Sequence, residues 1–134
     1  MDTLEDAIWE RLPKAWVAWV LLIVVLGCYA YVAGWSGFLF GPDRNRLLLF
    51  GALSASKVDK GELWRLSSSL FLHGDIIHLS FNAMALLVLC RMGEAIFGAI
   101  SMLWVLYFSG LLGAFFSWSM GTPNTVGASG AIFG

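Results

Sequence analysis

The order of hydrophobic and charged positions divides the chain into a charged start and a series of long apolar runs. Residues 1–14 contain six charged residues, with Leu4, Ile8 and Leu12 spaced at i, i+4 and i+8. This spacing predicts a short amphipathic helix that lies on the bilayer surface. The run from Ala15 to Trp35 has 21 residues and no charge. A helix of that length crosses the roughly 30 Å hydrocarbon core, so this run is predicted to be the first membrane span.

Two further apolar runs predict a second span over residues 76–97 and a third over residues 99–120. Asp75 stands directly before the second span, where its carboxylate can cap the first helical turn. After the third span, the turn-forming sequence GTPNTVG precedes residues 128–134, which open a fourth helix. So short a segment cannot cross a bilayer, and we therefore expect the sequence to stop within a helix.

The segment 36–75 differs from a free linker, because charged residues alternate with short apolar pieces such as RLLLF and SSSLFL. We expect a folded loop with short helices, partly embedded in the membrane and packed against protein or a wet cavity. The loop holds five Lys or Arg residues, against two in the N-terminal tail and Arg91 in the second span. The positive-inside rule would place this loop in the cytoplasm, although a folded, embedded loop weakens that rule.

Composition supports an integral membrane protein and excludes several functions. Hydrophobic residues make up 59% of the chain and charged residues 13%, and the mean hydropathy is +0.79. A net charge of -1 without a basic run gives a nucleic acid no electrostatic basis for binding. The two cysteines, Cys28 and Cys90, lie in apolar runs. They are therefore expected to pack between helices rather than to form a disulfide framework or a CxxC metal site.

Three polar side chains gather at the start of the second span, in the sequence HGDIIHLSFN: His73, His78 and Asn82. His78 and Asn82 are four residues apart, so they lie on the same face of a helix. Polar residues in a bilayer usually face the bundle interior or a water-filled cavity. A structural role, in hydrogen bonds between helices, would explain these three residues as well as a catalytic role would. A metal site is less favoured, because no third ligand stands at a suitable spacing.

Ser129 lies in the glycine-rich sequence GASGAIFG and allows two interpretations. Gly130 and Gly134 form a GxxxG pair, which is typical of close helix crossings. Alternatively, Gly127 and Gly130 remove bulk on both sides of a nucleophilic hydroxyl. Directly after a turn, Ser129 would stand at a helix N-terminus, where free backbone N–H groups can hold a developing oxyanion. A lone Gly-x-Ser-Gly is a weak signal.

Several motifs stand together in one order: Trp-Arg in the loop, His-x4-His-x3-Asn, Glu-x3-Gly at the end of the second span, and Gly-x-Ser-Gly-x3-Gly. Their residues are Trp64, Arg65, His73, His78, Asn82, Glu94, Gly98, Gly127, Ser129, Gly130 and Gly134. As a set, over roughly residues 15–134, the chain resembles the N-terminal part of a rhomboid intramembrane serine protease. Residues 1–14 would form an N-terminal tail before this membrane domain.

The resemblance implies an all-α, six-helix membrane bundle, of which this sequence covers three spans, the start of the fourth and the long first loop. It implies that Ser129 is the nucleophile, and that His78, Asn82 and the backbone N–H of Ser129 form the oxyanion hole. The general base would be a histidine on the sixth helix. Supporting roles would fall to His73, Gly127, Gly130, Trp64, Arg65 and Glu94, with Arg65 bracing the loop.

The resemblance also implies transmembrane helices as substrates, a lipid bilayer as the environment and no cofactor or metal. A bacterial inner membrane is expected from the short tail without an organelle-targeting sequence. The chain has only two histidines, and neither matches the expected base, so residues 1–134 alone are expected to be inactive. Two alternatives stay open: an inactive rhomboid relative that binds transmembrane clients, and a structural membrane protein whose small residues pack helices. Oligomeric state is not predicted.

Overall fold

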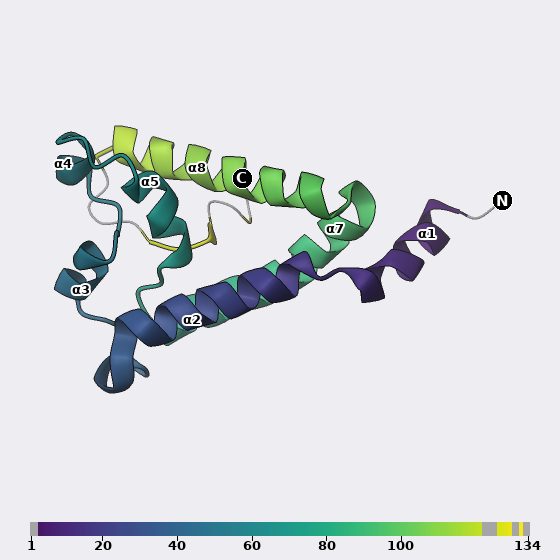
Figure 1. Cartoon of the computed structure of the whole chain (residues 1–134), viewed down its shortest axis with the longest axis horizontal. Coiled ribbons are helices and arrows are strands. Elements are labelled where there is room, and N and C mark those ends of the chain that lie inside the picture. The colour runs from purple at the N-terminus through teal and green to yellow at the C-terminus, as the bar shows by residue number, and fades with distance from the viewer. Residues whose placement is uncertain (1–2, 122–125, 130–131, 133–134) are drawn as a thin grey trace.

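The structure, a computed structural model, describes residues 3–121, 126–129 and 132. Three long helical segments carry the fold, and short helices connect or precede them (Figure 1). The long segments are α2 (Val17–Gly37), α6 with η3 and α7 (Ile76–Ala85, Leu86–Cys90 and Arg91–Phe97), and α8 (Ala99–Ser119). The short helices are α1 (Leu4–Arg11), η1 (Leu12–Lys14), α3 (Arg44–Leu49), α4 (Ala55–Val58), α5 (Arg65–Ser68) and η2 (Ser69–Phe71).

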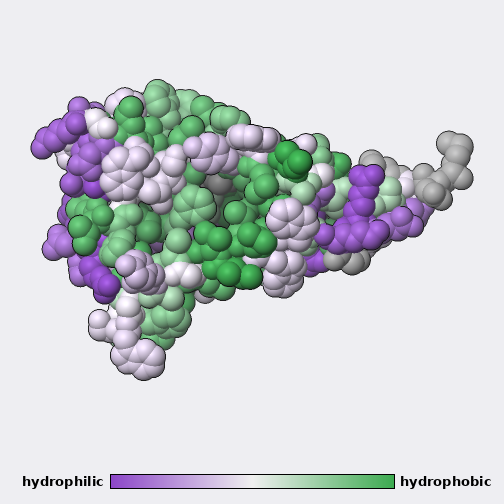
Figure 2. Space-filling model, viewed as in Figure 1, coloured by the Kyte–Doolittle hydropathy of each residue, from purple (hydrophilic) through white to green (hydrophobic). Residues whose placement is uncertain are grey.

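The three long segments are each long and apolar enough to cross a membrane, which confirms the three predicted spans. The first begins at Val17, two residues later than the apolar run, and the second contains a π-helical turn over Leu86–Cys90 that periodicity did not predict. Hydrophilic residues gather at the two ends of the molecule, over α3–α5 and over α1, with an apolar band between them (Figure 2). This distribution matches a bilayer with water on both sides.

The core lies where α2, η3 and α8 meet. One buried cluster joins Val17, Ala18, Leu86, Cys90, Met102 and Leu106. Cys90 is a free thiol within this cluster, so its predicted packing role is confirmed, while Cys28 is a half-buried free thiol. Toward α3–α5 the ribbons of α2 and α8 diverge (Figure 1), and an apolar cavity of about 450 Å³ lies between them. Ala128 and Ile132 line this cavity, which places the start of the fourth helix between α2 and α8.

Glu94 closes the narrow end of the bundle by capping another helix. Its two carboxylate oxygens accept the backbone N–H groups of Trp16, at 3.1 Å, and of Val17, at 2.9 Å. These N–H groups belong to the first turn of α2, which has no intrahelical acceptor for them, and a carboxylate also suits the positive end of a helix dipole. The sequence indicated only an interfacial glutamate, but the side chain is 7% exposed and joins α7 to α2.

The folded loop predicted over residues 36–75 is present, and Arg65 organises it. The guanidinium donates to the carbonyls of Leu48 at 2.7 Å and Ala52 at 3.0 Å, and pairs with Glu62 at 2.7 Å. Arg65 is buried and its neighbour Trp64 is half exposed, with the guanidinium carbon 4.6 Å from the Trp64 ring centre. The expected bracing role of Arg65 matches these contacts, because one side chain satisfies carbonyls that no helix satisfies.

The N-terminal helix α1 begins with a capping box that the apolar spacing did not reveal. The Thr3 hydroxyl accepts from the N–H of Asp6, and the Asp6 carboxylate accepts from the N–H of Thr3 at 2.9 Å. Pro13 follows the last turn of α1 and ends it in the short helix η1. Arg91 of α7 donates to the carbonyl of Leu12 at 3.0 Å, which fastens this segment to the second span.

Replacing Glu94 by glutamine should destabilise the bundle by about 0.5–2 kcal/mol, since one of the two capping acceptors becomes an N–H donor facing an N–H group. The free energy of unfolding in detergent micelles measures this effect. The matched control is Glu10→Gln, at an exposed position of α1, which should leave stability unchanged. Equal stability of the two variants would show that Glu94 does not hold α2 in place.

Candidate active site

The first turn of α6 positions two of the candidate residues. The Asp75 carboxylate accepts the backbone N–H of His78 at 2.7 Å, which confirms the predicted N-cap. One turn further on, the side-chain amide of Asn82 donates to the carbonyl of His78 at 3.1 Å. His78 and Asn82 therefore share one helix face, as their spacing predicted. Neither side chain makes a hydrogen bond to another helix within the described residues, so this part of the structure does not support a hydrogen-bonding role between helices.

His73 lies beneath this pair and is almost completely buried, with 1% of its surface exposed. Its ring stands edge-on to that of His78, with ring centres 5.2 Å apart. Neither ring nitrogen of His73 has a hydrogen-bond partner among the described residues. Burial, assisted by the neighbouring His78, lowers the pKa of His73 to about 4. His73 is thus neutral at pH 7 and packs as an uncharged support for His78.

Gly127 brings the start of the fourth helix against this polar face. Its backbone N–H donates to the carbonyl of Ser69 at 3.0 Å, and its φ of +119° is one that L side chains rarely adopt. A Cβ atom at this position would lie 2.6 Å from Cε1 and 2.7 Å from Nε2 of His78, and 3.7 Å from the Asn82 amide nitrogen. Only a glycine lets the backbone approach the imidazole so closely.

Ser129 follows two residues later and is exposed. The N–H of Ile132 donates to the carbonyl of Ala128 at 3.0 Å, so a helical turn begins here, as predicted. The N–H groups of such a first turn have no acceptor within the helix. No hydrogen bond joins Ser129 to either histidine within the described residues. Gly130 and Gly134 lie outside these residues.

The remaining sequence candidates lie away from this group. Glu94 stands 16 positions after His78 along one helical segment, which is roughly 24 Å at 1.5 Å per residue. Trp64 and Arg65 belong to the start of α5 and contact the loop rather than the histidines. The order of the motifs in the sequence grouped these residues with the site. In the structure, their contacts instead hold the helices and the loop together.

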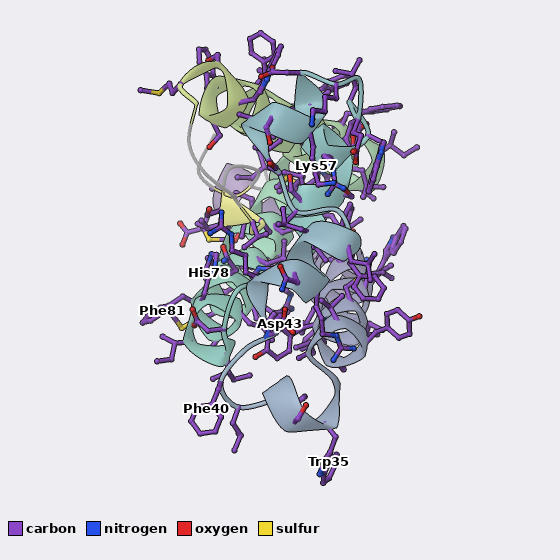
Figure 3. The ribbon with its side chains drawn as sticks, turned by 90° about the vertical axis from the view of Figure 1, so that its left-hand side faces the viewer. Trp35, Phe40, Asp43, Lys57, His78 and Phe81 are labelled. Carbon is purple, nitrogen blue, oxygen red and sulfur yellow. The ribbon has the colours of Figure 1, made fainter. Side chains whose placement is uncertain are left out.

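The arrangement offers a hydroxyl, amide donors and two imidazole rings at one end of the bundle. A side-chain amide has two N–H groups, so Asn82 keeps one donor after bonding the His78 carbonyl. Figure 3 shows His78 close to the surface at the end of the bundle that also carries Asp43 and Lys57. No group of three His, Cys, Asp or Glu side chains that could hold a metal ion occurs in the described part of the chain.

Fold and site together define an all-α, multi-pass membrane protein with a serine, two histidines and an asparagine in one region. The sequence model described as "Rhomboid domain" matches residues 60–134, more than half of the chain. The chain therefore belongs to the rhomboid family, which comprises intramembrane serine proteases and related proteins.

Individual relatives agree with this assignment. The chain is 38% identical over 117 residues to RHOMBOID-like protein 5 of Arabidopsis thaliana, covering 85% of this chain and 38% of the relative. It is 38% identical over 92 residues to rhomboid protease GluP of Bacillus subtilis, covering 69% and 18%. It is 32% identical over 130 residues to rhomboid protease AarA of Providencia stuartii, covering 85% and 46%. The chain thus spans less than half of the length of each of these relatives.

Gly127→Ala should destabilise the protein by about 1–3 kcal/mol, because the new methyl group collides with the His78 ring and strains the backbone. The matched control is Gly27→Ala in α2, where a Cβ atom meets nothing within 4 Å. Alanine there should be neutral or stabilising by up to about 1 kcal/mol. Unfolding in detergent micelles compares the two variants, and a tolerated Gly127→Ala would contradict the close approach to His78.

Stability should fall as the pH falls from about 6.5 to about 4, because of His73. The folded protein binds a proton at His73 only near pH 4. The unfolded chain binds it near pH 6.5, so unfolding takes up a proton between these values. The free energy of unfolding falls by at most about 3 kcal/mol, and the decrease levels off below pH 4. His73→Phe should remove this part of the pH dependence, and an unchanged slope would mean that His73 is not the titrating group.

Proposed function

We propose that the protein is an intramembrane serine endopeptidase that cleaves within or beside transmembrane helices of membrane-protein substrates. The observation that carries this proposal is the close approach of the Gly127 backbone to His78 and Asn82. It brings the start of the fourth helix, two residues before Ser129, to the polar face of α6. In this proposal Ser129 is the nucleophile, and a substrate carbonyl lies between Ser129 and that face.

Asn82, His78 and the backbone N–H of Ser129 form the proposed oxyanion hole. An amide is a donor at any pH, and Asn82 has one N–H left to give. A helix N-terminus adds free N–H groups and a favourable dipole for the charge that develops on the carbonyl oxygen. Removing one such donor typically lowers the rate about 10²–10³-fold. His73 supports His78 by ring packing in its neutral form.

The general base of the proposed reaction is a histidine that residues 1–134 do not supply. A serine hydroxyl is a weak nucleophile until a neighbouring base takes its proton. His78 stands in the first turn of α6 and His73 shortly before that helix, both on the proposed oxyanion side. The family resemblance assigns the base to the sixth helix, and residues 1–134 alone are therefore expected to be inactive.

The proposed substrates are single-pass transmembrane proteins, which reach the site through the bilayer. The apolar band between the two polar ends keeps the protein within that bilayer (Figure 2). We place it in a bacterial inner (cell) membrane; two of its relatives, GluP and AarA, are bacterial proteins, and others are plant proteins. Serine chemistry requires no cofactor.

A second candidate is a rhomboid relative that binds transmembrane clients without cutting them. It is favoured by one observation: neither of the two histidines in residues 1–134 stands where the family resemblance places the base. The apolar cavity of about 450 Å³ beside Ala128 and Ile132 would serve either function. Cleavage of a bound client separates the two.

Ser129→Ala should reduce cleavage to background while leaving the folded structure intact, because the hydroxyl oxygen attacks the carbonyl and the side chain is exposed. The assay uses the full gene product in liposomes with a fluorescent single-pass substrate, and binding of that substrate is measured in parallel. The control is Ser119→Ala, an exposed serine at the end of α8, which should keep full activity. Undiminished cleavage in Ser129→Ala would overturn the nucleophile assignment. Substrate binding without cleavage in the unsubstituted protein would favour the client-binding alternative.

A further inference from the structure

The second membrane span changes its winding halfway along its length. Leu86–Cys90 form a single π-helical turn, η3, between the α-helical segments α6 and α7. Its hydrogen bonds reach five residues along the chain instead of four, so this turn holds one residue more than the α-helical turn that it replaces. Such turns occur mostly singly and often near functional sites. Here the π turn separates the half of the span that carries His78 and Asn82 from the half that carries Glu94.

The buried side of the second span shows what the extra residue does. Four of its buried residues recur at intervals of four positions: Asn82, Leu86, Cys90 and Glu94. An α-helix turns by about 100° per residue, so an unbroken α-helix would leave the side chains of Asn82 and Glu94 about 120° apart. The π turn closes one full turn with an additional residue, which reduces this separation to about 20°. Both side chains therefore face the interior of the bundle.

The exposed side of the span agrees with this geometry. Val88 and Leu89 are neighbours within the π turn, and both are exposed, at 53% and 42%. Met84 before the turn and Met92 after it are exposed as well. The extra residue reduces the angle between these two methionines from about 80° to about 20°. One face of the span thus stays outward along its whole length.

Contacts with α2 explain why the two halves must stay aligned. The second span runs along α2 for most of its length (Figure 1). In the first half, Leu79 belongs to a buried cluster with Val25 of α2. In the π turn, Cys90 shares a cluster with Val17, nearer the start of α2. Glu94 then caps that start. Because both halves pack on one continuous helix, the second span has to present one continuous face to it.

We propose that the π turn is a register element of the second span, whose extra residue keeps the polar face of His78 and Asn82 in line with the capping carboxylate of Glu94. The cap fixes the rotation of α7 against α2, and the π turn carries this rotation into α6. Gly127 depends on it, since a Cβ atom there would lie 2.7 Å from Nε2 of His78. The residues of the π turn are thus positioning residues.

The alignment of the two halves does not depend on the proposed protease activity. Only its consequence for the oxyanion hole of Asn82 and His78 rests on that proposed function. The alignment is therefore tested by unfolding, and the consequence for catalysis is tested separately by cleavage.

The decisive variant is a deletion of Val88. It returns the π turn to an α-helical turn, while Asn82 and Glu94 keep their separation of about 20° because eleven residue steps then join them. Leu89, which is also exposed, takes the place of Val88. The full gene product with this deletion should fold. In that background, Glu94→Gln should lower the midpoint of thermal unfolding in detergent micelles by as much as it does in the unsubstituted protein.

Two matched variants should behave differently. Insertion of one alanine after Val88 rotates the two halves by about 100°, so Glu94 leaves the start of α2 and Glu94→Gln should cause no further shift of the midpoint. Deletion of Val105, which is 50% exposed in α8, removes one residue from a helix without a π turn. It rotates Met102 away from the face that carries Leu106, so it should lower the midpoint much more than deletion of Val88.

Three results would overturn the register role. The first is a deletion of Val88 that prevents folding or lowers the midpoint as much as deletion of Val105. The second is loss of the Glu94→Gln shift in the Val88 deletion, because the cap would then be broken. The third is an alanine insertion that keeps this shift, because the size of the turn would then not set the register.

Cleavage measurements test the consequence for the site. Deletion of Val88 should leave both kcat and KM for a single-pass substrate unchanged, because the polar face of α6 keeps its orientation. A fall in kcat, with the midpoint and the Glu94→Gln shift retained, would overturn the link between the π turn and the orientation of His78. Absence of cleavage in the unsubstituted protein would contradict the proposed function and leave the unfolding results to decide the register role.

Discussion

Backbone N–H and C=O groups within or beside a bilayer need partners from the protein, because lipid offers none. In this chain, charged side chains meet that need at several places where a helix begins or breaks, or where the loop turns. Glu94 caps the start of α2, Arg65 satisfies carbonyls of the loop, and Arg46 bonds a carbonyl at the break in α2. A chain with only 13% charged residues thus uses several of them as internal connectors. The arrangement of spans and loop depends on these few contacts.

The candidate site depends on a different constraint, which is the absence of a side chain at Gly127. Its backbone occupies the space beside His78 that any Cβ atom would take. The N–H bond from Gly127 to Ser69 holds the segment there, and the helical turn at Ser129 follows at once. The buried, neutral ring of His73 stands edge-on to that of His78. His78 therefore packs against both a glycine backbone and a buried imidazole.

The two ends of the bundle have different tasks. At the narrow end, contacts of Glu94 and Arg91 tie α7 to the N-terminal segment. At the wide end, α2, η2, α8 and the start of the fourth helix line an apolar cavity, and Gly127 abuts the polar face of α6. Polar groups and an apolar cavity thus occur at the same end of the bundle.

The sequence by itself determined the membrane class, the three spans and the shared face of His78 and Asn82, because these follow from apolar run length and helical periodicity. Its motif order also identified the family. Only the tertiary structure decided the cap formed by Glu94, the burial of Arg65, the neutral support from His73 and the break in α2 at Gly34. Each of these depends on contacts between residues far apart in the chain or on a backbone torsion. Local propensity and periodicity carry no information about either.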